Sequence, residues 1–144
     1  MIPLTLDASV LCKWYLDPAL EPDIAAAQSI AVALRDGNAV AVQPPHWIAE
    51  VGAVVTRILP DDARAILDAL HGVGAIVASQ PAVYRRAARL AIQTGAHLFD
   101  TLYHAVALET PGCTLVTADE RYWKAARSYS RVALLRDWTL STRY

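Results

Sequence analysis

The chain has 144 residues with a formal net charge of −1; 55% of them are hydrophobic and 19% are charged. This length fits one domain, so we expect a single domain over residues 1–144. The composition excludes an intrinsically disordered chain, which would hold fewer apolar and more charged residues. No apolar run reaches the roughly 18 residues of a transmembrane helix, and the start lacks the basic leader of a secretory signal. We therefore expect a cytoplasmic protein.

The balance of charge and the two cysteines exclude further classes. A net charge of −1 argues against a protein that coats nucleic acid through a broad basic surface, although a local basic rim remains possible. Cys12 and Cys113 are far apart and lie in no CxxC or CxxH pattern, so we expect reduced core thiols. The high apolar fraction for this size predicts surface buried between chains, and we expect self-association.

Short apolar runs alternate with longer helical patterns along the chain. The pattern opens with a strand over residues 2–6, followed by a short helix that ends before Asp17-Pro18. The predicted strands are residues 2–6, 39–42, 75–78, 113–117 and 132–135. The predicted helices are residues 10–16, 23–35, 46–58, 60–71, 81–93, 98–109 and 120–128. Strands separated by helices pair in parallel through right-handed crossovers. We therefore predict a three-layer α/β/α sandwich around a central, mostly parallel five-stranded sheet.

Four acidic residues stand apart from the ten others, which fall mostly in turns, caps or exposed helical positions. Asp7 directly follows the first predicted strand, and Asp119 lies two positions after the end of the fourth. Ligands of open parallel sheets bind beyond the carboxyl ends of the strands, where these two carboxylates are expected. Glu50 and Asp100 lie within otherwise apolar helical stretches. Either acid alone is more often an edge residue that reaches solvent.

Taken together, the four acids predict a metal site. Four carboxylates in one cleft repel each other and lose hydration, so they need a cation. All-oxygen ligation suits Mg²⁺ or Mn²⁺. Such an ion can activate a water molecule that displaces one side of a phosphodiester. The number of metal ions is left open.

The motifs around these acids resemble those of the PIN-domain nucleases, and within them the VapC-type toxin ribonucleases of toxin–antitoxin pairs. The resemblance runs from about residue 3 to residue 138. It is carried by residues 6–10 (LDASV) with Trp14, 50–51 (EV), 99–107 (FDTLYHAVA) and 115–120 (LVTADE).

The resemblance implies a PIN-like fold and a metal-dependent endoribonuclease. It implies that Asp7, Glu50, Asp100 and Asp119 form the catalytic and metal site for Mg²⁺ or Mn²⁺, with Asp7 and Asp100 as direct ligands. Ser9 and Thr117 match small hydroxyls that flank the site in the family. Ala53 departs from the pattern, because the family often has Asn there. The implied partners are an RNA substrate, a cognate VapB-like antitoxin and a second copy in a homodimer.

Other assignments stay open at this stage. A non-catalytic PIN-like module that binds RNA or protein is the alternative function. Phosphoaspartyl chemistry fits less well, because Ser9 stands where a dehalogenase-type phosphatase has its second Asp. His104, one turn after Asp100, is a further candidate for the cleft. The basic helical groups at residues 85–89 and 121–127 could contact phosphates, although such groups are usually solvated faces.

Overall fold

Five short parallel strands form a single sheet in the computed structural model, which describes residues 1–140. The strand order is β3-β2-β1-β4-β5, and every neighbouring pair is parallel. The strands are β1 (Ile2–Leu6), β2 (Ala39–Gln43), β3 (Ile76–Val77), β4 (Thr114–Thr117) and β5 (Val132–Leu134). The predicted α/β/α fold class is confirmed, and the sheet is parallel throughout.

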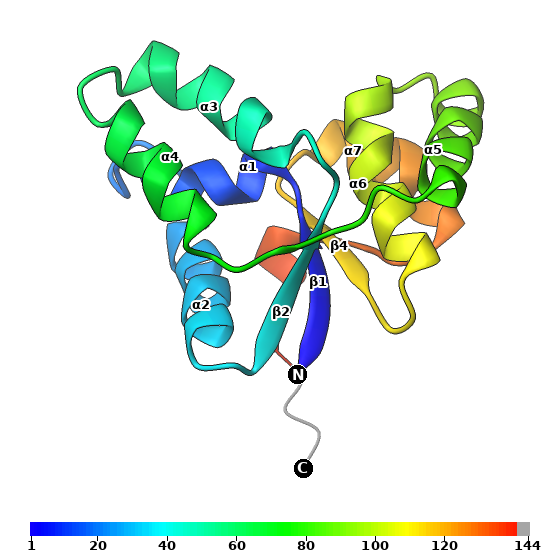
Figure 1. The fold of residues 1–144 in the computed structure, drawn as a ribbon, viewed down its shortest axis with the longest axis horizontal. Coiled ribbons are helices and arrows are strands. Elements are labelled where there is room, and N and C mark those ends of the chain that lie inside the picture. Colours follow the sequence, from blue (N-terminus) through cyan, green and yellow to red (C-terminus); the bar gives the residue numbers. More distant parts are fainter. Residues whose placement is uncertain (141–144) are drawn as a thin grey trace.

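Helices cover both faces of this sheet. Helices α1 to α4 lie on one side, and α5 to α7 lie on the other (Figure 1). The first group is α1 (Ala8–Leu11), α2 (Ile24–Arg35), α3 (Trp47–Ile58) and α4 (Ala63–His71), and the second is α5 (Pro81–Thr94), α6 (Leu98–Glu109) and α7 (Glu120–Ala126). The chain therefore winds from β1 outward to β3, returns through α5 and α6, and continues from β4 to β5.

The predicted elements all exist, and the differences lie at their ends. The helix predicted over residues 10–16 begins earlier, at Ala8, and after Leu11 tightens into a 3-10 turn over Cys12–Trp14. Asp7, in an extended conformation, is its N-cap residue, so no loop separates β1 from the helix. Helix α4 starts three residues later than predicted, because residues 60–62 form a turn. The last turn predicted for α7 is a 3-10 turn over Arg127–Tyr129.

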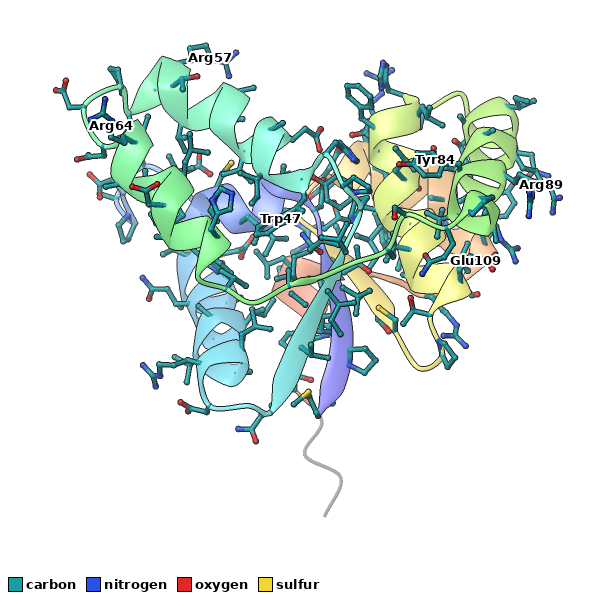
Figure 2. All side chains as sticks on the ribbon, viewed as in Figure 1. Trp47, Arg57, Arg64, Tyr84, Arg89 and Glu109 are labelled. Atoms are coloured by element: carbon teal, nitrogen blue, oxygen red, sulfur yellow. The ribbon has the colours of Figure 1, made fainter. Side chains whose placement is uncertain are left out.

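The core lies on both faces of the central strands. Leu4, Leu6 and Leu115 are buried within the sheet layer. Trp47 at the start of α3 is buried, whereas Arg57, Arg64 and Arg89 lie on the outer surfaces of α3, α4 and α5 (Figure 2). Cys12 and Cys113 are both buried free thiols, as predicted. The part of the chain described here holds no helix long and apolar enough to cross a membrane.

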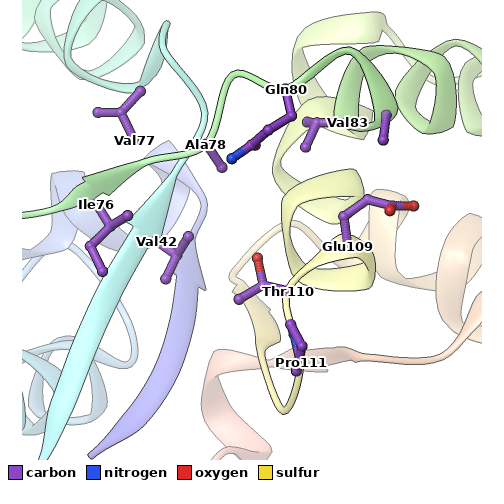
Figure 3. A pocket seen from close by; sticks show the side chains of 10 residues that line it. Val42, Ile76, Val77, Ala78, Gln80, Val83, Glu109, Thr110 and Pro111 are labelled. Carbon is purple, nitrogen blue, oxygen red and sulfur yellow. The ribbon is translucent and has the colours of Figure 1, made fainter.

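A hollow of about 420 Å³ lies beside the short edge strand β3. Val42, Ile76 and Val83 contribute apolar side chains to it, and Glu109 and Pro111 close it at the end of α6 (Figure 3). Ile76 and Val77 are about half exposed there. This hollow is lined by both apolar and polar side chains, and none of the four acids predicted to form the metal site lines it.

The winding of the chain reverses between β1 and β4, which are neighbours in the sheet. In open parallel sheets, the loops leaving two such strands diverge to opposite faces and leave a crevice beyond their carboxyl ends. Asp7 follows β1, and Ala118 and Asp119 follow β4. The first turns of α3 and α6 face the same edge, since α3 follows β2 and α6 leads back into β4. The topology therefore directs four segments to one crevice.

Candidate active site

The four predicted acids line one open cleft of about 440 Å³ at this crevice. Asp7, Glu50, Asp100 and Asp119 all contribute to its walls. Two of them come from strand ends and two from the first turns of helices, so we call these the strand wall (Asp7 and Asp119) and the helix wall (Glu50 and Asp100). The structure thus brings together all the residues predicted to hold a metal; their role as ligands remains a proposal.

Asp7 is held in place by two hydroxyl groups. Ser9 Oγ and Thr117 Oγ1 both donate hydrogen bonds to Asp7 Oδ2, at 2.7 and 2.8 Å. The hydroxyls accept in turn from the backbone of the loop after β4, because Ala118 N donates to Ser9 Oγ and Asp119 N donates to Thr117 Oγ1. Both hydroxyls predicted to flank the site therefore lie there, and they join the end of β1 to the end of β4.

Burial raises the pKa of Asp7 to about 6. The hydrogen bonds from Ser9 and Thr117 act against this rise, and the charges of Glu50 and Asp100 add to it. Burial of the Asp7 carboxylate therefore outweighs the two hydroxyl hydrogen bonds that favour its ionised form. Its Oδ1 atom accepts no hydrogen bond from the residues described, so that atom is left for a ligand.

A buried amide fixes the strand end that carries Asp7. Gln43, at the end of β2, accepts from Leu6 N at 2.8 Å and donates to Leu6 O at 2.9 Å. Asp7 N donates to Val116 O on the other side. The backbone that carries the carboxylate is therefore tied to both neighbouring strands.

Asp119 both caps a helix and lines the cleft. Its Oδ1 atom accepts from Tyr122 N at 3.1 Å, which caps the N-terminus of α7. The side chain also lines the cleft, and the residue is exposed. A capping Asp is common at such a position. The cap fixes where this carboxylate lies and leaves its second oxygen to the cleft.

Glu50 lies beside a histidine on the helix wall. His46 precedes it by one turn of α3, and His46 Nε2 lies 3.3 Å from Glu50 Oε2 and 3.0 Å from the carbonyl oxygen of Phe99. Burial acts to raise the pKa of Glu50, but the polar groups of His46 and Tyr103 outweigh it, so the net pKa lies below its ordinary value. Glu50 therefore stays ionised more readily than Asp7.

Three polar atoms of this wall are buried and make no hydrogen bond of good geometry among the residues described, although Glu50 lies close enough to His46 and Tyr103 for their polar groups to lower its pKa. They are His46 Nδ1, Glu50 Oε2 and the hydroxyl oxygen of Tyr103. Tyr103 is fully buried, and burial together with the charge of Glu50 raises the pKa of its hydroxyl. A buried polar atom without a partner costs about 1–3 kcal/mol. A group of them at one cleft wall indicates a place that a bound ligand or ordered water completes.

Asp100 faces the cleft from the first turn of α6. Burial raises its pKa, and the charges of Glu50 and Asp119 raise it further. Its carboxylate accepts no hydrogen bond within residues 1–140, in contrast to that of Asp7. The N-terminus of α6 partly compensates this charge, because a helix carries a partial positive charge at that end.

These observations fit a hard divalent cation. In the described part of the chain, no Lys or Arg nitrogen lies within 4.0 Å of any of the four carboxylates. Within residues 1–140, no three His, Cys, Asp or Glu side chains form a compact group ready to hold a metal. Mg²⁺ needs no such cage, since it keeps several waters and is usually bound through one or two carboxylates. Asp7 and Asp100 both have carboxylate oxygens that accept no hydrogen bond among the residues described, so they would be the residues to hold such an ion.

His104 does not reach the cleft. It is fully buried, its Nε2 donates to Ser130 O at 2.7 Å, and its Nδ1 accepts from the Tyr122 hydroxyl at 3.0 Å. The basic groups of α5 and α7 do not line the cleft either, and Arg86 pairs with Glu109. His104 is thus a core residue that joins α6 to α7.

Three residues at the site were not singled out by the sequence. Lys13 lines the cleft, and His46 and Tyr103 lie against Glu50. Helical spacing offers a signal for each, because His46 lies four residues before Glu50, Tyr103 three after Asp100, and Lys13 four after Ser9. That signal is too common in sequences to have identified them without the fold.

The PIN domain family model matches residues 4–128, which is most of the chain. The chain therefore belongs to the PIN-domain family, whose members are generally metal-dependent nucleases. A comparison with curated proteins found no match. The family assignment and the acidic cleft agree on a hydrolase of phosphodiesters in general.

Proposed function

We propose that this protein is a divalent-metal-dependent endoribonuclease and the toxin of a VapBC-type toxin–antitoxin pair. One observation carries the nuclease part: four carboxylates from four segments line one cleft, and none has a Lys or Arg partner among the residues described. Uncompensated carboxylates at this density favour a cation. A Mg²⁺ or Mn²⁺ ion, when bound, supplies Lewis acidity and lowers the pKa of water for phosphodiester hydrolysis.

The residues of the chain divide the remaining work. Ser9 and Thr117 hold Asp7 so that one carboxylate oxygen is engaged and the other faces the ligand. Asp100 offers a carboxylate that is free of hydrogen bonds within residues 1–140. Glu50, with its lowered pKa, stays ionised at neutral pH. The Asp119 carboxylate is fixed by its cap on α7 and widens the acidic surface.

A mixed RNA pool with Mn²⁺ or with EDTA tests the activity. We expect cleavage that requires Mn²⁺ and is lost in Asp100→Asn, because the amide is a weaker ligand for a hard cation. Asp68→Asn, an exposed substitution on α4, is the matched control and should cleave as the wild type does. Binding of RNA without cleavage in Mn²⁺ would instead support the alternative, a non-catalytic binding module.

A cognate VapB-like antitoxin is the proposed protein partner. An acidic cleft is complementary to an inserted Arg, whose planar guanidinium pairs with carboxylates through two hydrogen bonds. We expect the antitoxin to place an Arg or a bulky apolar side chain near Asp7 and Asp100. A purified complex that cleaves RNA as fast as the free protein would contradict this mode of inhibition.

A second copy of the chain is the other proposed partner. Large apolar side chains are exposed on β3 and α5, among them Ile76, Val77 and Ile92. Large apolar side chains left exposed in this way are compatible with an interaction surface. We expect a homodimer, and light scattering at several protein concentrations measures it. A monomer at tens of micromolar concentration, by the same measurement, would count against this proposal.

A further inference from the structure

Lys13 is a buried cation at the acidic cleft. It lies in the 3-10 turn that follows α1, and only 8% of its side chain is exposed. Its Nζ donates to Glu21 Oε2 at 3.0 Å and to Pro22 O at 2.9 Å. An ammonium group has three donors, so the described contacts leave one of them for another acceptor.

Within residues 1–140, Lys13 is the one basic residue among the acidic residues that line the cleft. The lining residues of the cleft include five acids and one cation, Lys13; the acids are Asp7, Glu21, Glu50, Asp100 and Asp119. An RNA strand that enters such a cleft carries its own negative charge. A metal ion at the carboxylates neutralises one phosphate, and the phosphates on either side still need a partner. Among the residues that line the cleft, only Lys13 provides a fixed positive charge for them.

We propose that Lys13 binds a phosphate of the RNA backbone next to the one that is cleaved, and that Glu21 is its positioning residue. This inference rests on the proposed function and deepens it. The pair with Glu21 and the Pro22 carbonyl holds the ammonium at the wall before substrate arrives, which reduces the ordering cost of binding. Lysine suits this task, because it acts on a phosphate as a compact point charge.

A purely structural role makes a different prediction. If Lys13 only fastens residues 21–22 to the 3-10 turn after α1, then removal of either partner lowers stability and leaves RNA affinity unchanged. A phosphate contact instead appears in the salt dependence of binding, because each neutralised phosphate of a single strand contributes about 0.7 to the slope of log K against log salt. The two roles are therefore separable by measurement.

The experiment compares Lys13→Met, Lys13→Arg and Glu21→Gln with the wild type. Methionine keeps the apolar stem packed, and thermal melts verify that each variant folds. Affinity for a short labelled single-stranded RNA is measured against salt concentration, with Ca²⁺ in place of Mn²⁺. Cleavage by the same proteins is measured in Mn²⁺. The control is Lys124→Met, which removes the other lysine of the chain from the exposed face of α7.

We expect Lys13→Met to weaken RNA binding about tenfold and to reduce the salt slope by about 0.7, as one lost phosphate contact requires. KM rises with kcat unchanged, because the contact is equally strong in the ground and transition states. Lys13→Arg restores the slope. Glu21→Gln weakens binding to a smaller extent and keeps the slope, since the charge of Lys13 remains.

Failure of the Lys13 inference can be distinguished from failure of the proposed nuclease function. An unchanged affinity and slope in Lys13→Met, while the wild type cleaves RNA, overturns the inference and leaves the proposed function standing. An equal loss of slope in Lys124→Met also overturns it, since the effect is then one of net charge. A wild type that binds RNA without cleaving it contradicts the proposed nuclease, and the slope of Lys13→Met still decides the phosphate contact. A wild type that binds no RNA contradicts both.

Discussion

The two walls of the cleft differ in how completely their polar groups are paired. On the strand wall, Asp7 accepts two hydroxyl hydrogen bonds and Asp119 accepts one from the backbone of α7. On the helix wall, Glu50 Oε2 and the Tyr103 hydroxyl are buried and make no hydrogen bond of good geometry among the residues described, although His46 Nε2 lies 3.3 Å from Glu50 Oε2. The polar groups of the strand wall are thus hydrogen-bonded within the protein, whereas those of the helix wall still have hydrogen-bonding capacity for a ligand.

This difference follows from where the side chains originate. Residues at strand ends lie next to backbone that has just left the sheet, so N–H and hydroxyl donors are close by. Glu50 and Asp100 lie in the first turns of α3 and α6, where backbone N–H groups are free, but within residues 1–140 their side chains project from the helix and accept none of those hydrogen bonds. The strand wall therefore defines the position of the site, while the helix wall leaves room for a ligand to complete it.

The largest expected effect comes from breaking the strand wall at Gln43. Gln43→Met keeps the length of the side chain but leaves the Leu6 N–H and C=O groups without their buried partner. At about 2 kcal/mol for each unpaired backbone group, the free energy of unfolding should fall by about 4 kcal/mol. Urea unfolding measures this. Gln93→Met on the exposed face of α5 should change stability by less than about 0.5 kcal/mol.

The pH dependence of the metal-free protein tests the charge of the strand wall. The pKa of Asp7 rises from its ordinary 3.8 to about 6 on folding, so between these values the folded state binds more protons than the unfolded state. Stability due to this group therefore increases as the pH falls through 6, and the total gain reaches about 3 kcal/mol once the pH is well below 3.8, at about 1.4 kcal/mol for each pKa unit.

Asp7→Asn removes this dependence and isolates it from other groups. His104 acts in the opposite direction, because burial lowers its pKa and its contribution is lost as the pH falls through the unfolded value. The quantity to measure is thus the difference between wild type and Asp7→Asn in EDTA at pH 4 and pH 7. A constant difference across this range would contradict the raised pKa.

Metal addition is expected to remove the difference between the walls. At 100 times its Kd, Mn²⁺ should stabilise the folded wild type by about 2.7 kcal/mol. Asp7→Asn should lose most of this gain, because an uncharged amide is a weak ligand for a hard cation. Thermal melts with EDTA and with Mn²⁺ measure both. If the melting temperature of the wild type does not respond to Mn²⁺, the site binds no metal.

The smallest effect is expected at the helix wall. Tyr103→Phe removes a buried hydroxyl that makes no hydrogen bond of good geometry but whose polar contact lowers the pKa of Glu50, so the two effects oppose and the stability of the metal-free protein should change by less than about 1 kcal/mol. Tyr122→Phe is the contrast, because its hydroxyl donates to His104 Nδ1. That substitution should cost about 1 kcal/mol. A similar loss in Tyr103→Phe would show that the helix wall is already paired.

Much of the site could be predicted from local pattern. Asp7 and Asp119 follow apolar runs, and the ends of parallel strands share an edge, so their meeting was predicted. Glu50 and Asp100 were singled out because they interrupt apolar helical faces and match the family motifs. Lys13 was not predicted from the sequence. A single basic residue within a short apolar run shows no pattern that distinguishes a residue lining a cleft from one on the surface.

The sequence by itself determined the alternation of strands and helices, the parallel sheet and the four acids, because periodicity and strand ends are local properties of the chain. Only the tertiary structure decided which groups pair. Gln43 and Leu6 are 37 positions apart, and Thr117 and Asp7 are 110 apart. Hydrogen bonds between such distant segments depend on strand order and register, which no local pattern encodes. The contrast between a paired and an unpaired wall was therefore set by packing, not by composition.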